Sequence, residues 1–244
     1  MTKTQYVCLC CGYRTFAFRP EGTYMYCEVC LWTDDPDNRH QILWFQNTFL
    51  EHGSCDLNIN SPTRQPTKEE ARPSWWFPLS KAYEYLGPKI RKAFSDTSLD
   101  GGTTLQMANH HISLSNGIES HPTTDVQVPH WSRLETTIEQ ETQISSLIFM
   151  DNLGIRYYLP AYMMHWIKNP ENVVYDVLLW CLERRGKQER FTSLLTHEQH
   201  QAVALFLAWL VFYHPITYGF DASEALKIHW KKYLSEDHRL QLGL

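Results

Sequence analysis

The cysteines of this chain are concentrated near its start, where their spacing could hold a metal ion. Five of the seven cysteines fall within the first thirty residues. Cys8 and Cys11 are separated by two residues, as are Cys27 and Cys30, and fifteen residues separate the two pairs. This spacing is typical of a zinc site in which two tight turns supply four thiolates to a tetrahedron. We therefore predict a structural zinc ion bound by Cys8, Cys11, Cys27 and Cys30.

The remaining cysteines leave two assignments open. Cys10 could replace one of the four ligands or pack beside them, and we favour Cys11 because only the Cys8 and Cys11 pair is followed by glycine. Gly12 can adopt positive φ and so lets the chain leave a tight turn. For Cys55 we expect a packing role in preference to ligation. An odd number of cysteines, with no signal peptide at the N-terminus, argues against a disulfide framework.

The segment between the two cysteine pairs predicts a β-hairpin. Polar and apolar residues alternate over 13–18, residues 22–26 lead into the second pair, and residues 19–22 have the composition of a turn. We expect this hairpin to carry a zinc ribbon. Because so small a module has little core, metal binding should supply much of its folding free energy, on the order of 10 kcal/mol. Four thiolates leave no open coordination position, so we do not expect hydrolytic chemistry at this metal.

Composition sets the class of the protein. The 244 residues suggest one or two domains at about 150 residues each, and a hydrophobic content of 43% excludes a disordered chain. The formal net charge is −5. No apolar run approaches the roughly 20 residues of a membrane span, and no apolar segment of a signal peptide is present, so we expect a cytoplasmic protein with no membrane contact.

A polar segment over 58–67, which contains two prolines, predicts a loop before a domain boundary. We place a zinc-ribbon domain at residues 1–74 and a mainly helical domain at residues 75–244, which together make an α+β fold. Apolar periodicity predicts helices over 132–148, 155–167, 169–181, 196–211 and 223–234, and residues 99–129 read mainly as loop. Thr196 and Gln199 form a capping box. Asp151 is expected either to cap the helix that follows it or to pair with Arg156.

The cysteine-rich segment resembles the bacterial cysteine-rich CPCC family over residues 5–74. The resemblance rests on Cys8-Leu9-Cys10-Cys11-Gly12, on Cys27-Glu28-Val29-Cys30 with its flanks, and on Gly53-Ser54-Cys55-Asp56. Leu9 and Glu28 stand where the family prefers proline. The resemblance implies a small protein of a kind often encoded near toxin systems.

Residues 87–240 resemble a bacterial helical domain of unknown function. The resemblance rests on Arg156-Tyr157-Tyr158-Leu159-Pro160-Ala161-Tyr162 and on Leu194-Leu195-Thr196-His197-Glu198-Gln199. It implies a mainly helical fold and no established activity.

Catalytic motifs are missing from the sequence. His197 and His200 lie three positions apart, whereas a zinc protease helix needs histidines four apart. No phosphate-binding loop, dinucleotide fingerprint or nucleophile elbow occurs. We therefore expect that the protein is not an enzyme.

Charge decides between the two kinds of partner that a zinc ribbon commonly has. Residues 1–75 contain seven Lys or Arg and nine Asp or Glu, whereas nucleic-acid binding relies on a basic surface. Residues 119–141 hold five acidic residues and one basic residue, which suits a basic protein partner. We expect a zinc-binding protein-interaction protein, specifically a bacterial immunity protein that neutralises a toxin encoded nearby. The alternative is a zinc-ribbon regulator that binds nucleic acid.

Overall fold

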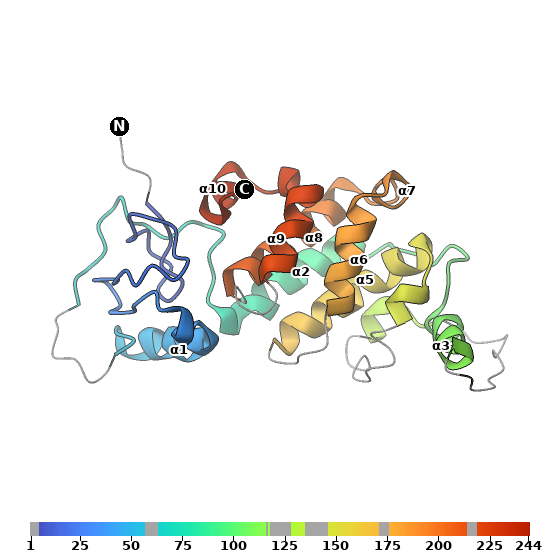
Figure 1. Ribbon diagram of the computed structural model, residues 1–244, viewed down its shortest axis with the longest axis horizontal. Helices are drawn as coiled ribbons and strands as arrows, with labels where there is room; N and C mark the ends of the chain where they lie inside the picture. The colour runs from blue at the N-terminus through green and yellow to red at the C-terminus, as the bar shows by residue number, and fades with distance from the viewer. Residues whose placement is uncertain are drawn as a thin grey trace. The chain divides into compact units, whose positions relative to one another are not determined.

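Every regular element in the described part of the chain is a helix. The computed structural model describes residues 5–56, 63–115, 117, 128–134, 146–170, 176–213 and 219–244. Within these ranges it contains no β-strand, and isolated bridges join Tyr6 to Phe16 and Tyr26 to Thr33. Irregular coil therefore surrounds the cysteines, next to helix α1 (Figure 1). The predicted α+β fold with a zinc-ribbon hairpin is wrong.

The hairpin fails because each segment pairs across its own cysteine turn. Tyr6 N donates to Phe16 O at 2.8 Å and Phe16 N donates to Tyr6 O at 3.1 Å, on either side of the first cysteine pair. Tyr26 and Thr33 make the equivalent bridge around the second pair. A tight turn brings the residues before and after it together, so the nearest pairing partner lies across the turn. The residues expected to form a hairpin ladder therefore form two isolated bridges, one around each cysteine pair.

The described residues form two compact units. The first comprises the described residues of Met1–Ala82, Leu207–Ser223 and Leu234–Leu244, and the second those of Tyr83–Phe206 and Glu224–Tyr233. The predicted boundary at residue 74 stays a prediction. The helices are η1 (Pro36–Gln41), α1 (Ile42–His52), η2 (Leu79–Lys81), α2 (Ala82–Phe94), α3 (Leu105–Ser115), η3 (Trp131–Arg133), η4 (Ser146–Phe149), α5 (Asn152–Lys168), α6 (Asp176–Gly186), α7 (Glu189–Thr192), α8 (His197–Tyr213), α9 (Gly219–Ile228), η5 (Trp230–Tyr233) and α10 (Glu236–Leu242).

Helices with strong local signals match their predictions. The helix expected over 155–167 is α5, and Asp151 caps it by accepting from Gly154 N at 2.8 Å. The capping box is confirmed, because Gln199 N donates to Thr196 Oγ1 at 3.2 Å and Thr196 N donates to Gln199 Oε1 at 3.1 Å. Helix α3 contradicts the loop expected around it. Much of the helix expected over 132–148, and the start of the one expected from residue 169, lies outside the described residues.

Aromatic side chains fill the core of the second unit. The rings of Trp166 and Phe206 meet edge to face with centroids 5.6 Å apart. Trp131 is buried, and its indole Nε1 donates to Phe94 O at 2.9 Å. The polar atom of this indole is therefore hydrogen-bonded inside the core. The high aromatic content of the sequence therefore serves packing in this unit.

In the first unit, the C-terminal segment packs on residues near the cysteines. Asp237 Oδ2 accepts from Trp75 Nε1 at 2.6 Å and from Arg14 Nη2 at 2.7 Å. Gln241 Oε1 accepts from Val7 N at 2.9 Å. The imidazole of His238 packs against the indole of Trp75, with ring centroids 4.3 Å apart. These contacts make helix α10 part of the structure that positions the cysteine turns.

His238 should make this packing sensitive to pH. Burial lowers its pKa to about 4, and Asp237 only partly opposes this effect. In the unfolded chain a histidine has a pKa of about 6.5. Between about pH 6.5 and about pH 4 the unfolded chain therefore binds a proton that the folded chain does not. The free energy of unfolding falls as the pH drops through this window. We expect His238 to contribute a loss of about 2 kcal/mol between roughly pH 7.5 and pH 5.

Urea unfolding of the wild type, His238→Asn and His40→Asn at both pH values measures this contribution. His40 is exposed and serves as the matched control. His238→Asn should show a smaller pH dependence than the other two proteins. An equal dependence in all three would contradict the assignment.

Candidate metal centre

The first cysteine turn is closed by its own backbone. Gly12 N donates to Cys8 O at 2.9 Å, and Cys8 N donates to Tyr13 O at 2.8 Å. Gly12 has φ of 79°, as predicted, and a Cβ atom there would lie 2.3 Å from Cδ2 of Trp76. Glycine is therefore required both by the left-handed backbone and by the close approach of the indole.

The second turn repeats the first. Leu31 N donates to Cys27 O at 2.7 Å, and Cys27 N donates to Trp32 O at 2.9 Å. Leu31 occupies the position equivalent to Gly12 and also has positive φ, 68°. The Trp32 ring stacks on Phe16, with centroids 6.1 Å apart. Two turns of the same construction therefore face one another.

The four predicted ligands come together. The sulfur atoms of Cys8, Cys11, Cys27 and Cys30 all lie within 4.8 Å of one another. Cys8 Sγ is 3.7 Å from Cys30 Sγ, and Cys11 Sγ is 3.7 Å from Cys27 Sγ. Four thiolates at about 2.3 Å from a tetrahedral zinc ion are about 3.8 Å apart. These two separations match a tetrahedral thiolate site, and the four sulfurs together could hold a metal ion.

The electrostatics of the cluster favour a cation at its centre. All four side chains have 0% exposure. Burial, followed by the neighbouring thiols, raises the pKa of Cys8 and of Cys30, whereas hydrogen bonds from neighbouring thiols, that of Cys11 first, lower the pKa of Cys27. Protonated thiols can therefore stabilise one thiolate among them. A divalent cation would stabilise four and displace the remaining protons.

Side chains from outside the two turns hold them in place. The hydroxyl of Thr15 lies 3.2 Å from Cys27 Sγ, where it can donate to the thiolate. Arg72 Nε donates to Cys11 O at 2.7 Å. The guanidinium of Arg72 also lies over the rings of Tyr13 and Trp76, at 4.4 and 4.9 Å from their centroids. Sequence spacing gave no signal for this support, since Arg72 is sixty-one positions from Cys11.

Gln46 of helix α1 links the first turn to the segment before α2. Its side chain has 0% exposure, and its Nε2 donates to Leu9 O at 2.7 Å. Its Oε1 accepts from Leu79 N at 2.6 Å. Both backbone groups would lose their partner in a Gln46→Leu variant.

We expect Gln46→Leu to lower the free energy of unfolding by about 2 kcal/mol, the cost of leaving buried polar groups unpaired. Asn47→Leu, at an exposed position of the same helix, is the matched control and should change little. Urea unfolding of the zinc-loaded proteins measures both effects. Equal stability of the two variants would show that Gln46 does not tie these segments together.

Two further cysteines lie beside the four. Cys10 has 0% exposure and Cys55 has 2%, and their sulfurs lie within 4.8 Å of each other and of Cys30. Cys55 N donates to Cys30 O at 2.8 Å, which attaches the segment after α1 to the second turn. The ligand set Cys8, Cys11, Cys27 and Cys30 stays a prediction. Cys55 had no spacing signal that could place it beside these cysteines.

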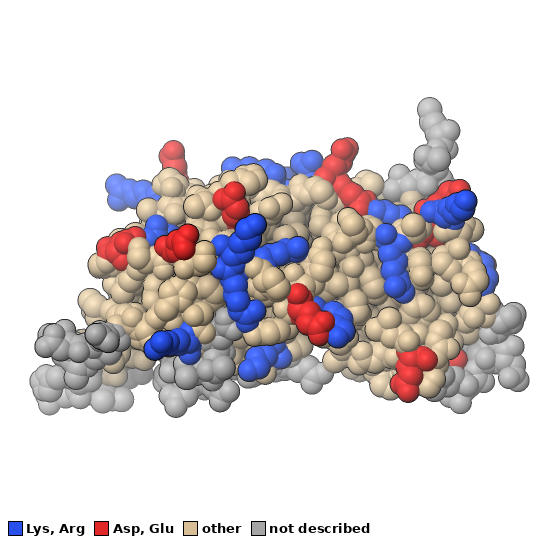
Figure 2. All heavy atoms as spheres, turned by 180° about the vertical axis from the view of Figure 1, so that it is seen from behind, with Lys and Arg blue, Asp and Glu red and all other residues tan. Residues whose placement is uncertain are grey.

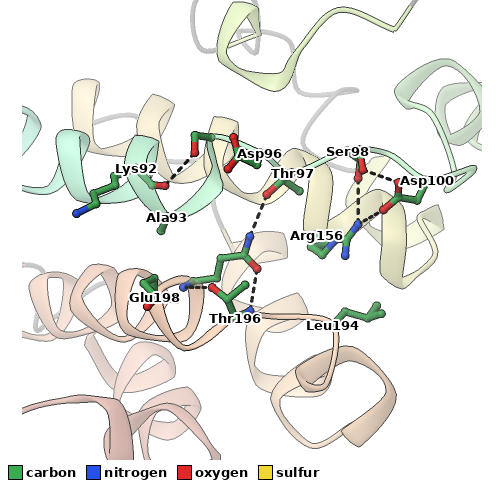
Figure 3. Close-up of a pocket in the computed structure, with 12 residues that line it drawn as sticks. Lys92, Ala93, Asp96, Thr97, Ser98, Asp100, Arg156, Leu194, Thr196 and Glu198 are labelled. Carbon is green, nitrogen blue, oxygen red and sulfur yellow. Dashed lines mark hydrogen bonds and ion pairs between the residues drawn. The ribbon is translucent and has the colours of Figure 1, made fainter.

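The second unit contains a pocket of about 420 Å³ between the end of α2 and the start of α8. Figure 3 shows Arg156 directed toward Ser98 and Asp100, and its Nη2 donates to Ser98 O at 3.0 Å and pairs with Asp100. Gln199 Nε2 donates to Thr97 Oγ1 at 2.9 Å. Asp100, and not Asp151, is thus the carboxylate of Arg156. The charges of the lining are mixed and several of its polar groups bond to one another, which suits at most a small polar ligand.

The comparisons with known proteins agree with both resemblances. The family model described as Cysteine-rich CPCC matches residues 6–70. The model described as Family of unknown function (DUF6714) matches residues 84–234, more than half of the chain. The chain belongs to this family. Comparisons with curated proteins and with solved structures gave no match. In this DUF6714 protein, no helix within the described residues is long and apolar enough to cross a membrane.

Proposed function

We propose that this DUF6714 protein binds a structural zinc ion through Cys8, Cys11, Cys27 and Cys30, and that it acts by binding another protein. The observation that carries the zinc proposal is the set of four fully buried sulfurs within 4.8 Å of one another, two pairs of which are 3.7 Å apart, close to the spacing in a zinc–thiolate tetrahedron. Soft thiolate ligands in a tetrahedron favour zinc among common cations. Four protein ligands leave no position for a reacting water, so the ion's role is to hold the two turns together.

Exposed aromatic side chains near the cysteines support the protein-binding part. Tyr24 is 64% exposed and Trp44 is 55% exposed, and Leu50 on the same helix as Trp44 is 50% exposed. Aromatic residues are enriched in protein interfaces, where tryptophan and tyrosine often dominate the binding energy. The metal-held turns and α1 fix the backbone on which these side chains stand.

A toxin encoded nearby is the specific partner that we propose. The formal net charge of −5 and the CPCC resemblance support it. Most of the acidic segment 119–141 lies outside the described residues. In the face drawn in Figure 2, described Lys and Arg residues are interspersed with Asp and Glu, a pattern that does not favour nucleic-acid phosphates.

Elemental analysis of the purified protein tests the zinc proposal, since absence of zinc after expression in zinc-supplemented medium would contradict it. Copurification with the product of the adjacent gene, combined with rescue of growth on co-expression, tests the partner. Trp44→Ala should weaken this complex by at least tenfold. Trp180→Ala is the matched control, because Trp180 is 43% exposed and lies in the second unit. Failure to form any complex would remove the immunity hypothesis.

A further inference from the structure

Six of the seven cysteines gather in one buried cluster, although a single tetrahedral ion needs four. The two additional thiols, Cys10 and Cys55, come from the first turn and from the segment after α1. With Cys30 they form a second group of three sulfurs that lie within 4.8 Å of one another. Cys30 therefore belongs to both groups, and it is the only residue they share among the described residues.

Backbone groups hold this second group in place. Cys10 Sγ lies 3.5 Å from Phe45 O, at hydrogen-bond distance for a thiol donor. The backbone bond from Cys55 N to Cys30 O, 2.8 Å long, fixes Cys55 beside a cysteine that already serves the first site. Gly53, with φ of 75°, ends α1 and turns the chain toward this position. The chain thus brings a third segment back to the cluster to add one thiol.

We propose that Cys10, Cys30 and Cys55 bind a second thiophilic divalent cation, such as Zn²⁺ or Cd²⁺, with Cys30 bridging the two ions. A thiolate sulfur has enough lone pairs to bind two cations. Ionising Cys10 and Cys55 adds two negative charges to the buried cluster, and a second divalent cation adds two positive charges. The net charge of six thiolates with two cations therefore equals that of four thiolates with one cation. Three protein ligands leave one coordination position of the second ion open, in contrast to the first site. The second ion should therefore exchange faster and bind more weakly.

Cadmium binding to the full-length, reduced protein tests this inference. We expect two cadmium ions per chain by native mass spectrometry, with the thiolate-to-cadmium absorption rising in two steps. One ion per chain would overturn the second site and leave the proposed zinc function intact. No bound ion would overturn both.

Variants locate the second ion. Cys55→Ser and Cys10→Ser should each bind one ion and keep the first absorption step, whereas Cys181→Ser, the matched control in helix α6, should bind two. If Cys55→Ser does not fold, the number of cadmium ions bound by the wild-type protein and by Cys10→Ser still decides the question. Two ions in both Cys55→Ser and Cys10→Ser would overturn the proposal. A measured mass two hydrogens below that of the fully reduced chain, after isolation under reducing conditions, would indicate a disulfide between Cys10 and Cys55. This result would also overturn the proposal.

Discussion

Replacing Cys27 with serine is expected to abolish zinc binding and to unfold the cysteine-rich part of the chain together with it. Cys27 Sγ faces Cys11 Sγ at 3.7 Å, and serine removes one of four soft ligands from a closed site. Within the described residues this segment contains single bridges and turns in place of a strand ladder, so the metal should supply much of its stability. The expected loss is on the order of 10 kcal/mol of metal-coupled folding free energy.

Zinc content by elemental analysis and near-ultraviolet circular dichroism report the two effects of Cys27→Ser. Trp32 packs next to the site, so its signal should be lost with the metal. Cys181→Ser removes a buried cysteine of the second unit and should keep full zinc content. Full zinc content in Cys27→Ser would sink the assignment of this ligand.

Replacing Asp34 with alanine is expected to have the next largest effect. Asp34 has 0% exposure, and its Oδ2 accepts from Gly22 N at 2.9 Å and from Thr23 N at 2.8 Å. Its Oδ1 accepts from Arg39 Nη2 at 2.6 Å, and Arg39 is itself buried. Alanine leaves a guanidinium and two backbone donors without this partner, which should cost about 3 to 5 kcal/mol.

Urea unfolding of the zinc-loaded proteins measures this cost. Asp37→Ala is the matched control, because Asp37 is exposed in the neighbouring helix η1 and should change the free energy of unfolding by less than about 0.5 kcal/mol. Asp34→Asn keeps an acceptor but removes the charge and should fall between the two. If Asp34→Ala and Asp37→Ala unfold at the same urea concentration, the buried ion pair does not stabilise this part of the fold.

The candidate site was predictable where its chemistry is local. A pair of cysteines two residues apart forms a turn whose hydrogen bonds lie within six residues, as in the bond from Cys8 N to Tyr13 O. The positive φ of Gly12 was predictable for the same reason, whereas the close approach of Trp76 to it was not. Cys55 was not, because its position depends on how helix α1 packs and where Gly53 turns the chain.

The sequence by itself determined the two cysteine turns, the four cysteines that they bring together and the long helices α5 and α8, because hydrogen bonds and apolar periodicity over a few residues specify each of them. The tertiary structure decided the pairing around the turns, the gathering of Cys10 and Cys55 at Cys30, and the packing of His238 and Gln241 near the cysteines. These features join residues as far as 234 positions apart. Local propensity carries no information about such partners, since only the folding of the whole chain brings them together.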